Sequence, residues 1–210
     1  MQIALTTIAV VANVIGASMA LPQARHLART RCVDGVSASW VGVSIALNAW
    51  WLAYGLSESV WALIPVSGIS LALYLTIAVL LVTTLGRRTF VGLGLGAFGL
   101  GMAPLPALLL GGWTAAGVAI GLSYGIQLFP AVVAAFRTRA LQGIAPATWI
   151  LAFVEAVLWL FYGWGIADAA LAVSGAVGAV LAGAILVRLA VTGHRPLRSL
   201  AWRRRVALVG

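Results

Sequence analysis

The sequence contains little charge. Only 8% of its 210 residues are charged, whereas 63% are hydrophobic. A typical soluble domain is about one-quarter charged, so a soluble chain of this length could not keep so much apolar surface away from water. The scarcity of charge therefore excludes a soluble globular protein and places the chain in a lipid bilayer.

Cysteine, histidine and acidic residues are also scarce. The lone Cys32 can form neither an internal disulfide nor a cysteine metal cluster. The two histidines, His26 and His194, lie near opposite ends of the chain, no HExxH motif occurs, and only Glu155 of the four acidic residues falls within an apolar segment. These residues are poorly placed for hydrolysis. We therefore expect no enzyme activity, no metal site and no cofactor.

Lysine is absent, so the net charge of +9 comes entirely from arginine. The arginines are scattered between apolar segments, with a cluster near the C-terminus. Nucleic-acid binding needs a basic patch on a soluble face, so we expect no nucleic-acid partner.

Apolar segments long enough to cross a bilayer, about 20 residues each, recur seven times. We therefore predict an all-α membrane protein with seven transmembrane helices. Residues 1–20 lack the positively charged start of a signal peptide, and we expect them to be retained as a helix. The predicted spans cover residues 3–24, 36–56, 60–84, 89–110, 113–136, 144–164 and 168–191.

Seven crossings would place every arginine on one side of the membrane. Because positive residues favour the cytoplasmic side, we expect an N-terminus outside, a cytoplasmic C-terminus, and a plasma-membrane location. If the fourth segment did not cross, Arg137 and Arg139 would lie opposite Arg29 and Arg31. We expect these four residues to fix the topology and to attract anionic lipid headgroups.

A repeat underlies this pattern. The tripeptide Arg-Thr-Arg occurs at residues 29–31 and 137–139, an offset of 137 − 29 = 108. Matched proline, tryptophan and Tyr-Gly positions are not expected by chance in an Ala/Leu/Val-rich sequence. At this offset Pro22, Gly35, Trp51, Tyr54 and Gly55 fall on Pro130, Gly143, Trp159, Tyr162 and Gly163. A one-residue deletion also pairs 66–68 with 173–175, and one residue of slippage pairs Trp40 with Trp149.

The repeat predicts the domain organisation. We expect a first three-helix repeat over 1–86, a linker transmembrane helix over 87–112, a second repeat over 113–192, and a basic cytoplasmic tail over 193–210. Four spans separate equivalent points, so both copies have the same orientation. Parallel repeats of this kind place a transport site at the repeat interface.

The stretch LPQARHLARTRCVDGVSASWVGVSIALNAWWLAYG closely resembles the PQ-loop motif of the PQ-loop/SWEET–SemiSWEET transporter superfamily. The likeness rests on Pro22-Gln23, the basic loop, Gly35-Val36-Ser37, Asn48, and Trp51 through Tyr54-Gly55. The second copy departs from it, because Ala131 follows Pro130. The resemblance implies two three-helix bundles around a central substrate path. The family includes facilitative sugar transporters and proton-coupled lysosomal amino-acid exporters.

Pro22 and Pro130 occupy the same depth in the two repeats. Proline removes one helical hydrogen bond and can kink a helix, and the resemblance implies that both are hinges for alternating access. A plain helix terminator is the alternative. The amide of Gln23 could bond the backbone group that a kink frees, or contact substrate. The family's sugar transporters carry four such prolines, but span two has none and Pro146 lies in the first turn of span six.

Two polar residues lie near mid-membrane. Asn48 is about 18 Å along its span at 1.5 Å per residue and is either a site residue or a contact between helices. Glu155 lies equally deep, where an acid costs about 2.5–3.5 kcal/mol on insertion scales. Burial favours its neutral form. We expect Glu155 to take up and release a proton during transport, or to bind a cationic or hydroxylated substrate. A permanently protonated packing residue is the alternative.

Aromatic and serine residues complete the predicted substrate site. Trp51 and Trp159 lie one turn from the polar pair, where flat rings suit sugar stacking, although packing or lipid contact is equally open. The resembled sugar carriers place an Asn in the third helix of each repeat. Here Ser67 and Ser174 occupy roughly that place, which weakens a sugar assignment.

Residues 94–99 spell GxGxxG, but they lie in an apolar span without a preceding strand or a downstream acid, so we exclude a nucleotide site. The small residues are better suited to close contact between helices.

We therefore expect a transporter that moves a small polar solute, a sugar or an amino-acid-like metabolite, by alternating access. The alternative is a non-transporting membrane receptor or scaffold on the same fold. The sequence leaves open the solute, the direction of transport, and whether the chain forms a homo-oligomer.

Overall fold

The computed structural model describes residues 2–19, 21–30, 36–137 and 146–191, and contains no strand within them. The all-α prediction is confirmed. The helices in these ranges are α1 (Gln2–Met19), α2 (Leu21–Thr30), α3 (Ala38–Ser57), α4 (Leu63–Leu85), α5 (Thr89–Phe98), the 3-10 helix η1 (Leu100–Met102), α6 (Leu105–Arg137), α7 (Pro146–Gly165) and α8 (Ala169–Val191).

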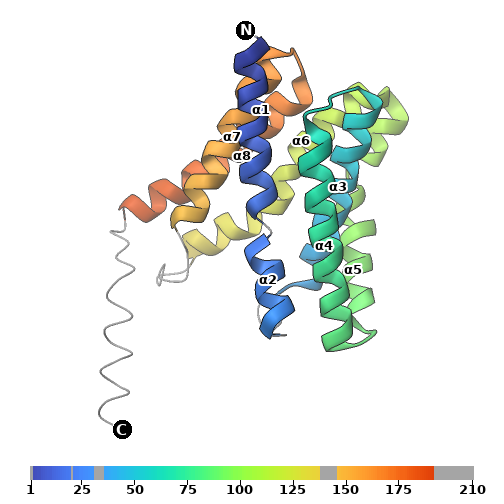
Figure 1. Cartoon of the computed structure of the whole chain (residues 1–210). Helices are drawn as coiled ribbons and strands as arrows, with labels where there is room; N and C mark the ends of the chain where they lie inside the picture. Colours follow the sequence, from blue (N-terminus) through green and yellow to red (C-terminus); the bar gives the residue numbers. More distant parts are fainter. Residues whose placement is uncertain (1, 20, 31–35, 138–145, 192–210) are drawn as a thin grey trace.

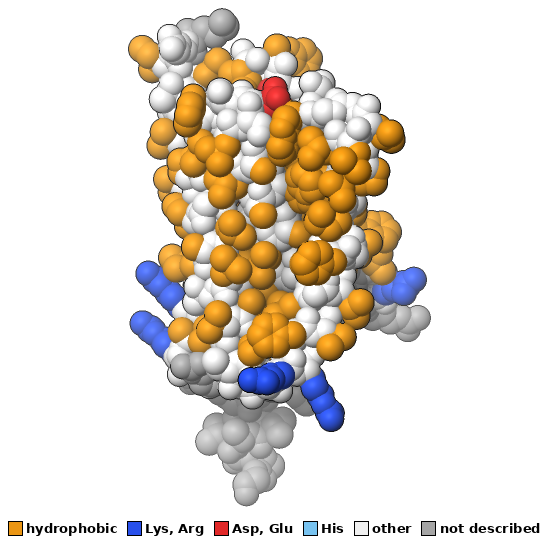
Figure 2. All heavy atoms as spheres, turned by 90° about the vertical axis from the view of Figure 1, so that its right-hand side faces the viewer, with side chains coloured by type: hydrophobic (Ala, Val, Ile, Leu, Met, Phe, Trp, Pro, Cys, Tyr) orange, Lys and Arg blue, Asp and Glu red, His pale blue; other side chains and the backbone are white. Residues whose placement is uncertain are grey.

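Five of these helices (α1, α4, α6, α7 and α8) are long and apolar enough to cross a membrane, and α5 with η1 forms a shorter apolar segment. On the face shown in Figure 2, apolar side chains cover the middle of the molecule, arginines gather toward one end, and an acid lies at the other. A lipid-facing surface has this pattern. We call these ends the arginine end and the acidic end. Seven crossings stay a prediction.

The first predicted span, 3–24, covers most of α1 and the start of α2. α1 ends at Met19 and α2 begins at Leu21, with Pro22 in the first turn of α2. Arg29, expected in a loop, lies in the last turn of α2. α2 is helical because Ala24 and Leu27 bury one face against α3 and α4, while its arginines stay exposed. Arg31 and Arg139 lie outside the described residues.

The fourth predicted span is interrupted. α5 ends before Gly99, η1 follows, and the chain re-enters a helix at Leu105. α6 then contains a second break at Gly112, whose φ of 66° favours a residue without a side chain. The expected continuous helix over 89–110 is therefore wrong, and the fifth predicted span begins beyond the Gly112 break. α6 stays helical through Pro130 and is visibly bent (Figure 1).

We group the helices by predicted repeat, with α1 to α4 in the first group and α6 to α8 in the second. α4 lies against α1, α2 and α3, whereas α8 lies between α6 and α7. Between the groups, α1 packs on α7 and α3 packs on α6, and α5 covers the far side of α3 (Figure 1). The first helix of each predicted repeat therefore touches the second helix of the other, as expected for two units related by a two-fold axis.

The turn between the second and third helices is built twice with the same hydrogen bonds. The amide of Val60 donates to the Gly55 carbonyl over 2.8 Å, and the amide of Asp168 donates to the Gly163 carbonyl over 2.8 Å. Ser59 and its counterpart at position 167 both have a φ of 57°. The repeat offset of 108 is therefore kept in the backbone at this turn.

Gly96 allows α5 to approach α3 closely. A Cβ at this position would meet the backbone carbonyl of Ser39, whereas a Cβ at Gly94 would meet nothing within 4 Å. The expectation that glycines in the GxGxxG segment permit close helix contact is confirmed at Gly96.

We predict that Gly96→Ala destabilises the protein by about 1–3 kcal/mol, because a methyl group must be forced against backbone. Thermal unfolding in detergent would show it as a lower melting temperature. Gly94→Ala is the matched control and should change stability by less than about 0.5 kcal/mol. Equal effects of the two substitutions would contradict the close α3–α5 contact.

Candidate functional site

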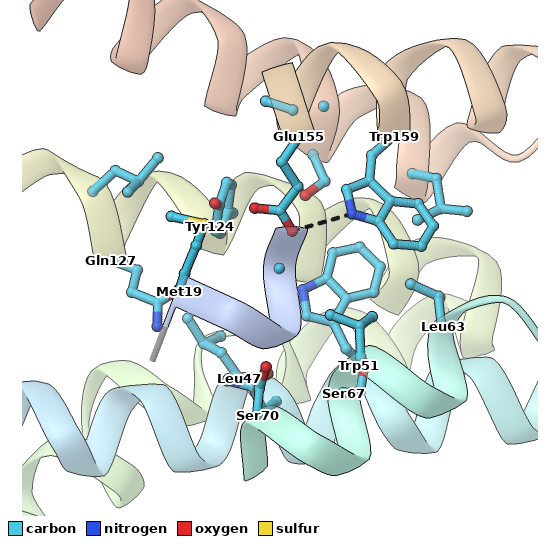
Figure 3. Close-up of a pocket in the computed structure, with 18 of the residues that line it drawn as sticks. Met19, Leu47, Trp51, Leu63, Ser67, Ser70, Tyr124, Gln127, Glu155 and Trp159 are labelled. Atoms are coloured by element: carbon cyan, nitrogen blue, oxygen red, sulfur yellow. Dashed lines mark hydrogen bonds between the residues drawn. The ribbon is translucent and has the colours of Figure 1, made fainter. Parts of the chain in front are cut away.

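A cavity of about 300 Å³ lies between the two groups of helices (Figure 3). This volume is at the lower end of the range for ligand pockets, about 300–1,000 Å³, and suits a small solute. Three helices from each predicted repeat line it. The lining residues are Gly16 and Met19 of α1; Trp40, Leu47, Asn48 and Trp51 of α3; Leu63, Val66, Ser67, Ser70 and Tyr74 of α4; Tyr124, Gln127 and Leu128 of α6; Thr148, Glu155, Ala156 and Trp159 of α7; and Leu171, Ser174 and Gly175 of α8.

The cavity wall repeats at the sequence offset of 108. All lining residues except Ser70, Tyr74 and Leu128 form pairs separated by this number. The pairs are Gly16 with Tyr124, Met19 with Gln127, Trp40 with Thr148, Leu47 with Glu155, Asn48 with Ala156, Trp51 with Trp159, Leu63 with Leu171, Val66 with Ser174, and Ser67 with Gly175. The cavity therefore lies between two equivalent walls.

The unbroken offset changes two sequence pairings. Ser174 faces the cavity as the partner of Val66, and Gly175 as the partner of Ser67, so the one-residue deletion is not needed. Trp40 pairs with Thr148 and not with the neighbouring tryptophan. The one-residue deletion aligned three identical residues in the sequence. In the structure, the lining residues of α4 and α8 pair at the offset of 108 without it.

All six predicted substrate residues line this one cavity: Asn48, Trp51, Ser67, Glu155, Trp159 and Ser174. Of the predicted hinges, Pro130 does not. Pro130 lies on an exposed face of α6, and the side chains of Pro22 and Gln23 are outside the described atoms. Arg29 and Arg137 end α2 and α6 at the arginine end.

Glu155 places a nearly buried carboxyl group in the cavity wall. It is only 9% exposed. The indole Nε1 of Trp159, one helical turn away, donates to Oε1 of Glu155 over 3.3 Å (Figure 3). The absence of a side chain at Gly16 makes room for this carboxyl group, since a Cβ there would meet Oε1. Its second oxygen accepts no hydrogen bond from the described part of the chain.

The two tryptophans are held in the same way. Trp51 meets Tyr54 edge-to-face with ring centroids 6.0 Å apart, and Trp159 meets Tyr162 edge-to-face at 5.8 Å. Both indoles line the cavity (Figure 3). Edge-to-face pairs are favourable aromatic geometries, so they orient the indoles before a solute arrives.

Sequence reasoning missed the polar side chains that α6 contributes. Gln127 donates through Nε2 to the hydroxyl of Ser44 over 2.8 Å, and its backbone carbonyl accepts from the Trp40 indole over 3.4 Å. Tyr124 also reaches the cavity. Gln127 carried the same signal as Asn48, an amide inside an apolar span. Tyr124 gave no such signal, because its counterpart at the repeat offset, Gly16, is not a polar or aromatic residue.

Asn48 itself makes one contact within its own helix. Its Nδ2 donates to the Ser44 carbonyl over 2.8 Å, and its Oδ1 accepts nothing from the described residues. Asn13, for which no role was predicted from the sequence, also joins two helices. It donates to the Ala62 carbonyl over 2.8 Å and accepts from the Val66 amide over 2.9 Å, so it caps α4 from α1.

The family model described as "Sugar efflux transporter for intercellular exchange" matches residues 117–191, which are 75 of the 210 residues. The resemblance to the SWEET–SemiSWEET superfamily is confirmed. The match runs from the middle of α6 to the end of α8, the region of the second predicted repeat. No curated protein sequence matches the chain.

In this SWEET-like chain the cavity is closed toward the acidic end. Tyr54, Leu63, Trp159 and Leu171 pack there in one buried apolar cluster. Beyond it, the Tyr54 hydroxyl donates to Oδ2 of Asp168 over 2.9 Å. This bond joins α3 to the start of α8, across the two groups of helices. A second hollow of about 530 Å³ lies outside this closure.

Both carboxylate oxygens of Asp168 accept hydrogen bonds at the acidic end of the cavity. Its Oδ1 accepts from the Leu171 amide over 2.9 Å, which caps the N-terminus of α8. Its Oδ2 accepts the hydrogen bond from the Tyr54 hydroxyl. Tyr162 is the counterpart of Tyr54 at the repeat offset, but its hydroxyl has no hydrogen bond within the described ranges.

We predict that Tyr54→Phe lowers the free energy of unfolding by about 1 kcal/mol, because it removes a hydrogen bond to a carboxylate. Tyr162→Phe removes the equivalent hydroxyl without removing such a bond, and it should leave the melting temperature unchanged. Thermal unfolding of both variants in one detergent tests this. A larger loss for Tyr162→Phe would contradict the one-sided bond.

Proposed function

We propose that the chain transports a small polar solute across the membrane by alternating access through the cavity between the two repeats. One observation carries this proposal. The cavity has two walls paired at an offset of 108, and a cluster between those walls closes it at the acidic end. A site between two equivalent bundles can open to either side when the bundles rock against each other.

The seven-crossing topology is part of the proposal. Arginines of the described chain gather toward one end (Figure 2), which fits two three-helix repeats joined by a crossing linker made of α5, η1 and the start of α6. The positive-inside rule then places the arginine end in the cytoplasm. The acidic end would face outward at the plasma membrane, and the arginines would meet anionic headgroups.

The movable joints would lie at the proline in the first helix of each repeat. Pro22 lies in the first turn of α2, and Pro130 lies inside the bent α6. Pro130 removes one helical hydrogen bond, so bending costs less there than elsewhere in α6. Both joints lie on the arginine side of the cavity.

The solute would sit between Trp51 and Trp159, against the carboxyl group of Glu155. The family match supports a sugar or a similar hydroxylated compound. Asn48, Ser67 and Ser174 offer hydrogen-bonding groups in the same cavity. Glu155 would also take up and release a proton during the cycle, because a buried acid is most easily accommodated in its neutral form.

Uptake by the purified protein in proteoliposomes tests transport directly. We expect saturable flux of at least one solute from a panel of sugars, amino acids and amines. Trp159→Ala should lower it by about tenfold or more, because an aromatic wall of the site is lost. If no solute moves, the non-transporting receptor or scaffold becomes the better reading.

Glu155→Gln separates proton linkage from simple facilitation. We expect uptake by the native chain to change between about pH 5.5 and pH 7.5, across which a perturbed carboxyl group can titrate. Uptake by Glu155→Gln should be independent of pH over the same interval, because glutamine keeps the shape but has no proton to exchange. A pH profile that survives the substitution would exclude Glu155 as the coupling residue.

A further inference from the structure

The cavity contains one acid and no base. Glu155 is the only Asp, Glu, Lys, Arg or His among its lining residues in the described chain. We propose that the transported solute is a small organic cation, an amine without a carboxylate, and that it exchanges with the proton of Glu155. This inference rests on the proposed transport function and specifies its solute.

The first argument is charge. A carboxylate buried away from water needs a positive partner or a proton. The Trp159 indole supplies one neutral hydrogen bond to Oε1. The groups of other helices around the site are also neutral: Met19 of α1, Asn48 of α3, Tyr74 of α4, Tyr124 and Gln127 of α6, and Ser174 of α8. Among the described residues nothing carries the charge to balance an ionised Glu155, which leaves a proton or a bound cation.

The second argument is the aromatic wall. Trp51 and Trp159 come from opposite walls, and both lie beside the carboxyl group of Glu155 (Figure 3). The faces of aromatic rings attract cations, and tryptophan does so most strongly. Tyr74 and Tyr124 extend this surface toward the arginine end. An ammonium group between the indoles would meet ring faces and the free oxygen of Glu155 together.

The third argument is what the cavity lacks. A solute carboxylate or phosphate would find no lysine, arginine or histidine among the described lining residues. Burying an unpaired charge is costly, so amino acids and organic anions should be excluded. A neutral sugar would avoid that cost but would leave the carboxyl group without a cation.

Proton and amine would compete for the same carboxyl group. When the amine binds, Glu155 releases one proton to the solution on that side. When the amine leaves on the other side, Glu155 takes up one proton there. One positive charge moves in each direction, so the exchange is electroneutral and responds to a pH difference but not to a membrane voltage.

Choline is a suitable probe because it is a quaternary amine with a hydroxyl group and no carboxylate. We expect proteoliposomes with an acidic interior to accumulate choline, and an imposed voltage to leave its uptake unchanged. Calorimetric titration of the native protein in two buffers of different ionisation enthalpy should show about one proton released per choline bound. Apparent affinity should fall toward tenfold per pH unit at acidic pH, where the proton outcompetes the cation.

Glu155→Gln should weaken choline binding by at least about tenfold, because the cation loses its charged partner. Glu58→Gln makes the same acid-to-amide change at an exposed position outside the cavity and should bind choline like the native chain. Melting temperatures of both variants would report whether they are folded.

The outcomes separate this inference from the transport proposal. If the native protein moves glucose but neither binds nor moves choline, the solute class is wrong and the transport proposal stands. If it moves no solute, both are wrong. If choline binds without proton release, or binds equally well to a folded Glu155→Gln variant, the exchange at Glu155 is excluded.

Discussion

The backbone hydrogen bond that closes the turn between the second and third helices determines the geometry of the site. Val60 to Gly55 in one half, and Asp168 to Gly163 in the other, fix how the third helix returns along the second. Because this turn is the same in both halves, Leu63, Val66 and Ser67 of α4 line the cavity as the counterparts of Leu171, Ser174 and Gly175 of α8. The third-helix part of the paired lining depends on two short turns at the acidic end.

The two repeats carry different side chains at some equivalent positions of the cavity wall. Leu47 is the counterpart of Glu155, and Asn48 is the counterpart of Ala156, so the acid belongs to one wall and the amide to the other. The closure at the acidic end is also one-sided, because Tyr54 bonds to Asp168 while its counterpart at position 162 does not. The backbone of the two halves is similar, but their side chains differ in charge and in hydrogen bonding.

Sequence reasoning located much of the cavity because polar residues in apolar helices are few. Asn48 and Glu155 needed a protected place inside the bundle, and both line the cavity. It could not place Tyr124, because lipid and helix interfaces are similarly apolar and periodicity does not tell which face turns inward. The breaks after Phe98 and at Gly112 were missed for a related reason, since hydropathy measures composition and not the continuity of a helix.

The Leu47–Glu155 pair has a consequence for how such a cavity can change. In a carrier assembled from two identical short chains, every substitution on the axis appears twice. A glutamate there would face its own copy, and the two like charges would disfavour joint ionisation. A chain that carries both walls covalently, with different residues at positions 47 and 155, is free of that constraint. It can hold an odd number of charges in its cavity, here a single one.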